Sequence, residues 1–498
     1  MRKLLFLISL ILLTTTCSCS MAEEALAPAN VTYQVFVSSF QDSDGDGMGD
    51  LQGIIDQLDY IAALGVDRLW LSPIHPSVSY HKYDVLNYEA VDSDFGTLED
   101  FDRLVAACRE RGIGVMLDLV VNHTGEGHPW FRQACEALQN QVDSPYVGWY
   151  NFTQGQGMHP VPGTDWYYEG QFGPHMPDLN LDSPDVRAEI ARIIAFWQAR
   201  GVCGFRLDAV TSYYTGAPLA SRDFLRFLTD AAKAADPDCY LVGEAWTDAS
   251  AILTLYGSGV DSLFNFPAAD STGVFVQAAL GGKGAAAARL MADWNAQLRE
   301  ASPASVDAPF LTNHDLNRAA GMLRLKAPFE KAAAMLYLLM PGRPTVYYGE
   351  ELGMTGSGLD ENKRLPMLWS AAEGAALCSP PAAADQKQRL KEGADVQAAD
   401  PDSLLSWYRQ VIALRRQAPE LLRGVMTAID LGEPDLACYR VADGGGAVVI
   451  LMNLSQTDTR SVALDALSAV YVDGCGQPVF DGSTLALPPV SCALLRAE

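Results

Sequence analysis

Eight short apolar runs, each followed by a longer segment with helical spacing of its apolar residues, constrain the fold of this chain most strongly. Regular alternation of strand and helix is typical of an α/β fold built on a parallel sheet. Eight such units predict a (β/α)₈ TIM barrel, in which chemistry sits at the carboxyl ends of the strands. The expected strands cover residues 33–37, 68–71, 115–120, 204–207, 240–242, 263–266, 310–312 and 345–348. Helices are expected over residues 52–64, 98–111, 185–200, 222–235 and 328–339.

Two stretches interrupt the alternation and define the domain organisation. Residues 124–176 are rich in Gly, Pro and aromatic residues and are too long for an ordinary loop, so a small inserted domain over the barrel mouth is expected. After a helix-like segment at residues 404–416, short alternating runs separated by Gly and Asp predict a C-terminal β-sandwich over residues 423–498. The barrel itself should occupy residues 27–422.

The amino terminus has the pattern of an export signal. Two basic residues precede an apolar run at residues 4–13, which is too short to cross a bilayer of about 30 Å as a helix. We therefore interpret residues 1–20 as an export signal. Cys17 and Cys19 follow the run closely and allow two outcomes, lipidation as in a bacterial lipoprotein or simple cleavage and release. The protein is expected to be secreted, or anchored to the cell membrane through such a lipid.

Charge excludes some classes of partner. The chain has 35 Lys and Arg against 61 Asp and Glu, a net charge of −26. Nucleic-acid affinity comes mainly from cations that neutralise phosphates, so no nucleic-acid partner is expected. Apart from an N-terminal lipid, the same argument disfavours binding to an anionic membrane surface. We expect the protein to act as a monomer.

Acidic residues follow several of the expected strands. Asp208, Glu244 and Asp315 come after three different runs and should therefore converge on one barrel mouth. Such residues can simply cap helices or form salt bridges. A set of three carboxyl groups, however, suits cleavage of a glycosidic bond, in which one donates a proton and another attacks or assists at the anomeric carbon.

Four segments resemble the signature regions of the α-amylase family of glycoside hydrolases, in the family's order. They are residues 118–123 (DLVVNH), 204–209 (GFRLDA), 242–246 (VGEAW) and 310–315 (FLTNHD). The resemblance implies that Asp208 is the nucleophile and Glu244 the general acid and base. It also implies that Asp315 stabilises the transition state. Such a mechanism retains the anomeric configuration.

The resemblance also implies a set of substrate-binding residues. Tyr83 and Asp84 resemble the stacking aromatic residue and the sugar-binding acid of the family, although Lys82 stands before them where Gly is common. The remaining substrate-binding residues are expected to be His123, Arg206, His314 and Arg318. Arg206 lies two residues before Asp208 on the same strand face, so its charge can keep that carboxylate ionised.

The sequence DSDGDGMGD at residues 42–50 predicts a calcium site. Its acids stand at positions 1, 3, 5 and 9 with Gly at position 6, which gathers hard oxygen ligands at a tight turn. Position 12 is Gly53 instead of Glu, so the loop is not an EF-hand. The loop resembles the Ca²⁺ loop after the first barrel strand of family members, which implies as ligands Asp42, Asp44, Asp46, the Met48 carbonyl and Asp50.

These features together predict an α-amylase that cuts α-1,4 bonds in starch-like α-glucans and maltooligosaccharides. Thr211 and Ser212 replace a Lys-His pair that many family members use on the leaving-group side. An oligosaccharide-specific α-glucosidase, an oligo-1,6-glucosidase or a transglycosylase therefore remains an alternative. A non-catalytic glucan-binding protein is a second alternative, which the intact acidic trio disfavours.

Overall fold

The computed structural model describes residues 28–372, 375 and 377–497; the export signal predicted at residues 1–20 lies outside them. Parallel strands form a seven-stranded sheet in the order β10, β1, β2, β3, β7, β8, β9. Isolated parallel bridges join both edges of this sheet to residues 308–310, through Phe264 with Ala308 and Phe310 with Thr345. The sheet is thereby closed, which confirms the predicted (β/α)₈ barrel. The strands are β1 (Thr32–Val35), β2 (Arg68–Leu71), β3 (Gly114–Leu119), β7 (Val202–Leu207), β8 (Tyr240–Gly243), β9 (Ser262–Leu263) and β10 (Thr345–Tyr347).

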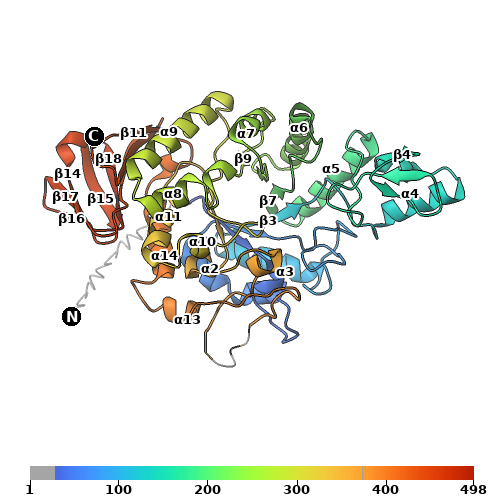
Figure 1. Cartoon of the computed structure of the whole chain (residues 1–498), viewed down its shortest axis with the longest axis horizontal. Helices are drawn as coiled ribbons and strands as arrows, with labels where there is room; N and C mark the ends of the chain where they lie inside the picture. Colours follow the sequence, from blue (N-terminus) through green and yellow to red (C-terminus); the bar gives the residue numbers. More distant parts are fainter. Residues whose placement is uncertain (1–27, 373–374, 376, 498) are drawn as a thin grey trace, which may run out of the picture.

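Helices surround the barrel, and the five single helices expected at residues 98–111, 185–200, 222–235, 328–339 and 404–416 are present with small shifts at their ends (Figure 1). Local capping explains several starts; Thr97 and Asp100 form a reciprocal capping box on α3. No described helix is both long and apolar enough to cross a membrane. The barrel helices are α1 (Leu51–Asp56), α2 (Leu58–Leu64), α3 (Leu98–Glu110), α5 (Pro184–Ala199), α6 (Pro218–Ala235), α7 (Ala249–Tyr256), α8 (Val274–Gly281), α9 (Gly284–Ala301), α10 (Ala319–Met322), α11 (Ala327–Leu338), α12 (Asp360–Lys363), α13 (Ala394–Gln397) and α14 (Leu404–Arg416). Short 3-10 turns are η1 (Val37–Ser39), η3 (Phe266–Ala268), η4 (Glu350–Leu352) and η5 (Pro419–Leu421).

Three expected elements differ in detail. The helix expected at 52–64 is broken at Gln57, whose φ of −104° and ψ of 9° leave the helical region. The strand expected at 263–266 ends at Leu263, because the Asn265 side chain caps the turn η3 and Pro267 occupies its first positions. Residues 310–312 do not form a full strand. Their part in the sheet is the single bridge from Phe310 to Thr345.

The insertion expected at residues 124–176 contains a helix and a small antiparallel sheet. The helix is α4 (Pro129–Asn140), and the sheet has the order β4 (Phe152–Gln154), β6 (Trp166–Tyr168), β5 (His159–Pro160). The 3-10 turn η2 (Pro145–Trp149) links helix and sheet. Phe131 of α4 packs on Phe152 and Tyr168 at ring-centroid distances of 6.1 and 4.9 Å, which fastens helix to sheet. In Figure 1 this segment projects at the opposite end of the molecule from the C-terminal strands.

The C-terminal residues form two antiparallel sheets. Five strands have the order β11 (Val425–Ala428), β12 (Leu436–Asp443), β13 (Gly446–Asn453), β18 (Ser491–Ala497), β15 (Ala469–Cys475). A three-stranded sheet has the order β14 (Arg460–Ala463), β17 (Thr484–Leu487), β16 (Val479–Phe480), and the turn η6 (Leu464–Leu467) follows β14. Alternate residues of β12 face opposite ways: Cys438 lies in a core with Leu485, whereas Tyr439 joins the main barrel core. The larger sheet is therefore packed between the smaller sheet and the barrel.

Candidate active site

A cleft of about 560 Å³ lies at the carboxyl ends of the barrel strands. Its walls combine residues that follow β3, β7, β8 and the bridge at Phe310, together with residues of the insertion. Its lining includes Tyr83, His123, Asp208, Glu244, His314 and Asp315. The structure thus brings the three predicted catalytic acids to one mouth.

Arg206, near the end of β7, is the centre of the acidic cluster and is buried. Its Nη1 lies 2.7 Å from an oxygen of Asp118 and 2.6 Å from Asp208 Oδ1. Its Nη2 lies 3.0 Å from Glu244 Oε1. One cation therefore faces three carboxyl groups in a site that is buried from water. Ionisation of all three carboxyl groups at once is strongly disfavoured there. Asp118 was absent from the predicted site set, although its position in the segment 118–123 at the end of a strand was the signal for it.

Glu244 is the predicted catalytic acid that keeps its proton near neutral pH. Burial, together with the negative charges of Asp208 and Asp315, raises the pKa of Glu244 to about 8, against the opposing effect of the positive charge of Arg206. The amide of Ala209 donates to Glu244 Oε2 at 2.9 Å. Ala209 has a φ of 46°, in the left-handed region, so the turn directly after Asp208 helps to aim the amide at Glu244. Near neutral pH the site therefore holds a positioned acid.

Asp315 is held ionised. Burial alone would raise its pKa, but contacts with His314 and Arg364 bring the pKa of Asp315 below its usual value. Arg364 Nη2 lies 2.8 Å from Asp315 Oδ1, and His314 Nε2 lies 3.1 Å from Oδ2. Because burial lowers the pKa of His314 to about 3, this imidazole is neutral near pH 7. The opposing positive charge therefore comes from Arg364.

His314 is fixed by contacts on both ring nitrogens. Gln34 Nε2 lies 2.7 Å from Nδ1, and the Tyr83 hydroxyl lies 2.6 Å from Nε2. If the Gln34 amide donates to Nδ1, the neutral ring carries its proton on Nε2 and donates to Tyr83 or Asp315. Tyr83 in turn donates to Asp118 at 3.0 Å, and its ring stacks on His314 with 6° between the planes. Tyr83 and His314 thus form one preorganised wall of the cleft.

Two buried polar side chains retain unused hydrogen-bonding capacity. Both ring nitrogens of His123, and Asp84 Oδ2, lack a hydrogen-bond partner among the residues that the structure describes. Asp84 Oδ1 accepts from Ser77 Oγ at 2.5 Å and from Ser79 Oγ, so that carboxylate is held at one oxygen and free at the other. Buried polar groups are normally satisfied. A ligand with several hydroxyl groups would supply the missing partners.

Lys82 anchors the segment that carries Tyr83 and Asp84. Its φ of 64° is in the left-handed region, a backbone conformation that favours Gly. The buried Lys82 ammonium lies 2.9 Å from Asp92 and 3.1 Å from Asp94. The ion pairs tie the segment to the loop before α3. They outweigh the preference of this left-handed backbone conformation for Gly.

Arg318 is not brought into the cleft. Its guanidinium is buried against the rings of Tyr347 and Tyr348, at 4.5 and 4.6 Å from their centroids. It donates to the backbone oxygens of Lys363 and Tyr348 at 2.8 and 2.6 Å. Arg318 therefore supports the loop before Arg364. It was expected to bind substrate, but it does not line the cleft.

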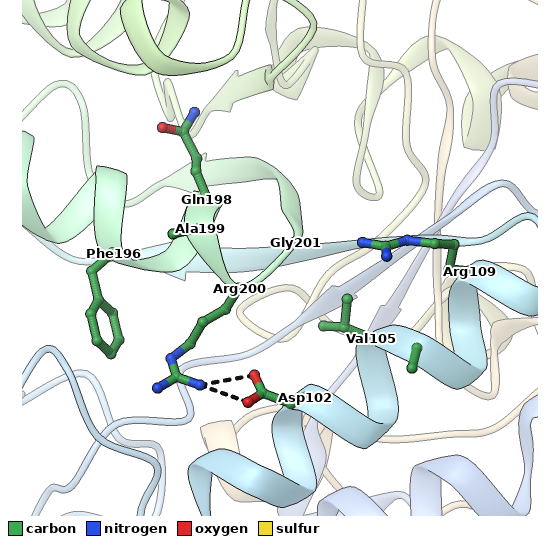
Figure 2. Close-up of a pocket in the computed structure, with 9 residues that line it drawn as sticks. Asp102, Val105, Arg109, Phe196, Gln198, Ala199, Arg200 and Gly201 are labelled. Atoms are coloured by element: carbon green, nitrogen blue, oxygen red, sulfur yellow. Dashed lines mark hydrogen bonds and ion pairs between the residues drawn. The ribbon is translucent and has the colours of Figure 1, made fainter.

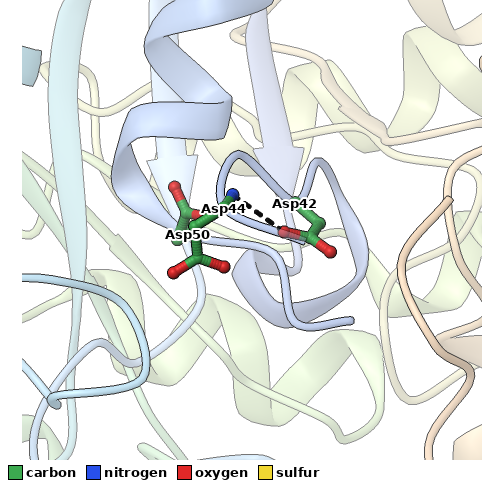
Figure 3. A group of neighbouring side chains, drawn as sticks. All are labelled: Asp42, Asp44 and Asp50. Atoms are coloured by element: carbon green, nitrogen blue, oxygen red, sulfur yellow. Dashed lines mark hydrogen bonds between the residues drawn. The ribbon is translucent and has the colours of Figure 1, made fainter. Parts of the chain in front are cut away.

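The acidic loop at residues 42–50 brings together part of its predicted ligand set. One oxygen each of Asp42, Asp44 and Asp50 lies within 4.8 Å of the others (Figure 3). Asp46 lies outside this group and accepts from the Met48 amide at 2.7 Å. Hard carboxylate oxygens at this spacing fit a Ca²⁺ ion.

A larger hollow of about 690 Å³ lies between α3 and α5, away from the carboxyl ends of the strands; Gly201, which lines it, directly precedes β7 (Figure 2). Among its described lining residues the acid is Asp102, which is paired with Arg200 at 2.7 Å. That pair leaves the hollow without a free acid and base, so its chemistry does not match that of the cleft.

Comparison with known proteins gives a consistent result. Residues 34–424 match the family described as "Alpha amylase, catalytic domain". "Alpha-amylase 3" of Dictyoglomus thermophilum is 33% identical over 450 residues, which cover 86% of this chain and 85% of that protein. "Trehalose-6-phosphate hydrolase" of Escherichia coli is 31% identical over 507 residues, which cover 86% of this chain and 90% of that protein. The solved structure of Eubacterium rectale Amy13B has a TM-score of 0.87 at 38% identity and covers 94% of this chain and 95% of its own.

Proposed function

This chain belongs to the α-amylase family of glycoside hydrolases, and we propose that it cleaves α-1,4-glucosidic bonds of starch-like α-glucans and maltooligosaccharides with retention of configuration. One observation carries the mechanism: Glu244 with a pKa of about 8 and Asp208 share the guanidinium of Arg206. A proton donor and a nucleophilic carboxylate thus lie within reach of the same sugar.

In the first step, a carboxylate oxygen of Asp208 attacks the anomeric carbon while Glu244 gives its proton to the bridging oxygen. The bond between carbon and bridging oxygen breaks, and the leaving sugar departs with the proton. Asp315, ionised beside Arg364, faces the positive charge that develops on the sugar ring.

In the second step, the ionised Glu244 takes a proton from water, and the water oxygen attacks the anomeric carbon. The bond to Asp208 breaks, which restores the carboxylate and leaves Glu244 protonated for the next cycle. His123, Tyr83 and Asp84 would hold the sugar. His123 and Tyr83 line the cleft, and the buried side chains of His123 and Asp84 retain polar atoms without a partner among the described residues.

The choice of α-1,4 bonds rests on the relative named α-amylase, at 33% identity over most of both chains. Other relatives are named for other substrates, for example trehalose-6-phosphate hydrolase, so the alternative specificities also need an experimental test. Time-resolved product analysis on amylose, pullulan and isomaltose in parallel separates them. Early mixed maltooligosaccharides from amylose would support the proposal, whereas glucose alone, or turnover confined to isomaltose, would contradict it.

We further propose that the loop at residues 42–50 binds a structural Ca²⁺ through Asp42, Asp44 and Asp50, completed by Asp46 and the Met48 carbonyl. A bound cation would neutralise carboxylates that otherwise repel one another. The loop is built into the barrel, because Asp50 caps α1 and the Gly49 amide donates to Ser38 O at 2.8 Å. Stability of the barrel should therefore depend on the ion.

Residues 1–20 also support a proposal of export, with release or a lipid on Cys17 or Cys19. Labelling with a radioactive fatty acid, compared between the wild type and Cys17→Ser and Cys19→Ser variants, tests the lipid. The proposal that the protein works as a monomer is tested by sedimentation velocity.

A further inference from the structure

Two cysteines of the C-terminal domain lie directly opposite each other on neighbouring antiparallel strands. Cys475 ends β15, Cys492 is the second residue of β18, and the two are register partners. Both side chains are buried, and both are free thiols. Residues that face each other in an antiparallel pair have Cα atoms about 4.5 to 5.5 Å apart, which is within the range that a disulfide spans. The glycosidase mechanism uses neither cysteine.

An irregularity in β15 creates this alignment. The register shifts by one residue between Tyr471 and Asp473, which makes Val472 an extra residue in β15. Without this bulge, the register of the first part of the strand would continue and would place Cys475 opposite Ser491. The bulge therefore brings the two thiols together on one face of the sheet.

The two side chains are in contact, which limits their reactivity in the folded sheet. The contact with Cys492, followed by burial, raises the pKa of the Cys475 thiol well above its ordinary value. Because the thiolate is the nucleophile in thiol–disulfide exchange, Cys475 reacts slowly while it is buried. β15 is, however, an edge strand of the five-stranded sheet. The pair can therefore react while the chain folds, or when this edge opens locally.

The chain between the two cysteines makes an excursion into the smaller sheet. It leaves the larger sheet after Cys475, forms β16 and β17, and returns with β18 (Figure 1). A bond between Cys475 and Cys492 would close this loop of residues 475–492 at its base. Closure of such a loop lowers the conformational entropy of the unfolded chain and thereby stabilises the folded one.

We propose that Cys475 and Cys492 form a disulfide that fastens β16 and β17 to the larger sheet. The proposal is independent of the glycosidase activity and rests on the proposed export, because disulfides persist in oxidising compartments outside the cytosol.

The bond forms by two exchange reactions with an oxidant that is itself a small or protein disulfide. One cysteine thiolate attacks the disulfide of the oxidant, and one thiol of the oxidant leaves. The second cysteine thiolate then attacks the mixed disulfide at the cysteine sulfur, and the other thiol of the oxidant leaves. The two cysteines thus lose two electrons and two protons, and the oxidant gains them.

Peptide mapping of the full chain, purified after export, tests the bond without any variant. Free thiols are alkylated, and the protein is then digested with trypsin without reduction. The tryptic peptide of residues 461–496 contains both cysteines and no other. We expect this peptide to be unalkylated and lighter by the two lost hydrogen atoms. Alkylation of both Cys475 and Cys492 in the exported protein would overturn the proposal.

A melting experiment tests the stabilising role of the bond. Dithiothreitol should lower the Tm of the wild type by about 5 °C and leave the Tm of the double variant Cys475→Ala/Cys492→Ala unchanged. Cys438→Ala is the matched control, because Cys438 is buried in β12 of the same sheet and lies opposite Leu451; its Tm should fall with dithiothreitol as in the wild type. An equal fall in the double variant would overturn the proposal.

Incubation of the purified chain with oxidised glutathione separates the pairing from the proposed export. If the chain stays in the cytosol with its thiols reduced, formation of the same unalkylated peptide in glutathione supports the pair and refutes only export. Glutathione bound to either cysteine without a bond between them, or no reaction at either, would overturn the proposal. None of these measurements depends on glucan hydrolysis.

Discussion

Replacing Glu244 with Gln isolates the contribution of one proton. Glutamine keeps the size of the side chain and can still accept the hydrogen bond from the Ala209 amide, which is 2.9 Å long in the native site. It cannot give a proton to the leaving oxygen. General acid catalysis contributes typically 10²- to 10⁴-fold, so kcat/KM on maltopentaose should fall about 10³-fold, or about 4 kcal/mol.

The site itself sets the pH at which this proton is available. With a pKa of about 8, Glu244 is protonated in roughly ten of eleven molecules at pH 7. A Glu of ordinary pKa, about 4.3, would be protonated in only about one molecule in 500. Activity needs the protonated form, so it is present below the raised pKa and lost as the pH rises through it. The wild-type profile of kcat/KM should therefore show a basic limb near pH 8.

The assay is steady-state hydrolysis across pH, combined with mass spectrometry of the peptide that contains Asp208. With α-maltosyl fluoride, whose leaving group needs no proton, Glu244→Gln should still form the glycosyl-enzyme. It should then accumulate this intermediate, because water has lost its base. Glu300→Gln, an exposed change on α9, is the matched control and should leave the rate unaltered. A Glu244→Gln rate within tenfold of wild type, or a basic limb that persists in it, would refute the reasoning.

Three further predictions follow from other contacts. Arg364→Gln should raise the pKa of Asp315 by removing its cation, so the acidic limb of the kcat/KM profile should move to higher pH; an unmoved limb would mean that another group controls it. Chelation with EDTA, or Asp42→Asn, should lower Tm if Ca²⁺ binds the acidic loop, and unchanged melting by calorimetry in both cases would reject the ion. Lys82→Met should lower the free energy of unfolding by about 3 kcal/mol, because it leaves the buried Asp92 without its cation, and urea denaturation that gives less than 1 kcal/mol would show that the pair is dispensable.

Much of the architecture could be predicted because the apolar residues whose spacing marks each strand or helix are the residues that become buried. Short apolar runs mark strands covered on both faces, and their ends mark the mouth where Asp208, Glu244 and Asp315 meet. Periodicity could not reveal the break at Gln57, since the buried residues Leu58 and Ile61 continue the helical spacing across it. The pattern of apolar residues indicates which face of a helix is buried. It does not indicate a local change in backbone hydrogen bonding.

Predictions for single side chains depended on contacts between distant segments. Arg318 was expected at the cleft, but the rings of Tyr347 and Tyr348 hold its guanidinium away from it. Asp118 was overlooked as a site residue, although it shares Arg206 with Asp208. Tertiary packing decides which partner a charged side chain contacts. The spacing of residues along the sequence does not contain that information.

The anomeric configuration of the first products tests the central claim most directly. Proton NMR of maltotetraose hydrolysis, recorded before mutarotation equilibrates the sugars, distinguishes the α from the β hemiacetal. Attack by Asp208 followed by attack of water inverts the same carbon twice, so the α-anomer should appear first. If the β-anomer appears first, the water attacks directly, and the covalent role of Asp208 together with the two-step use of Glu244 is wrong.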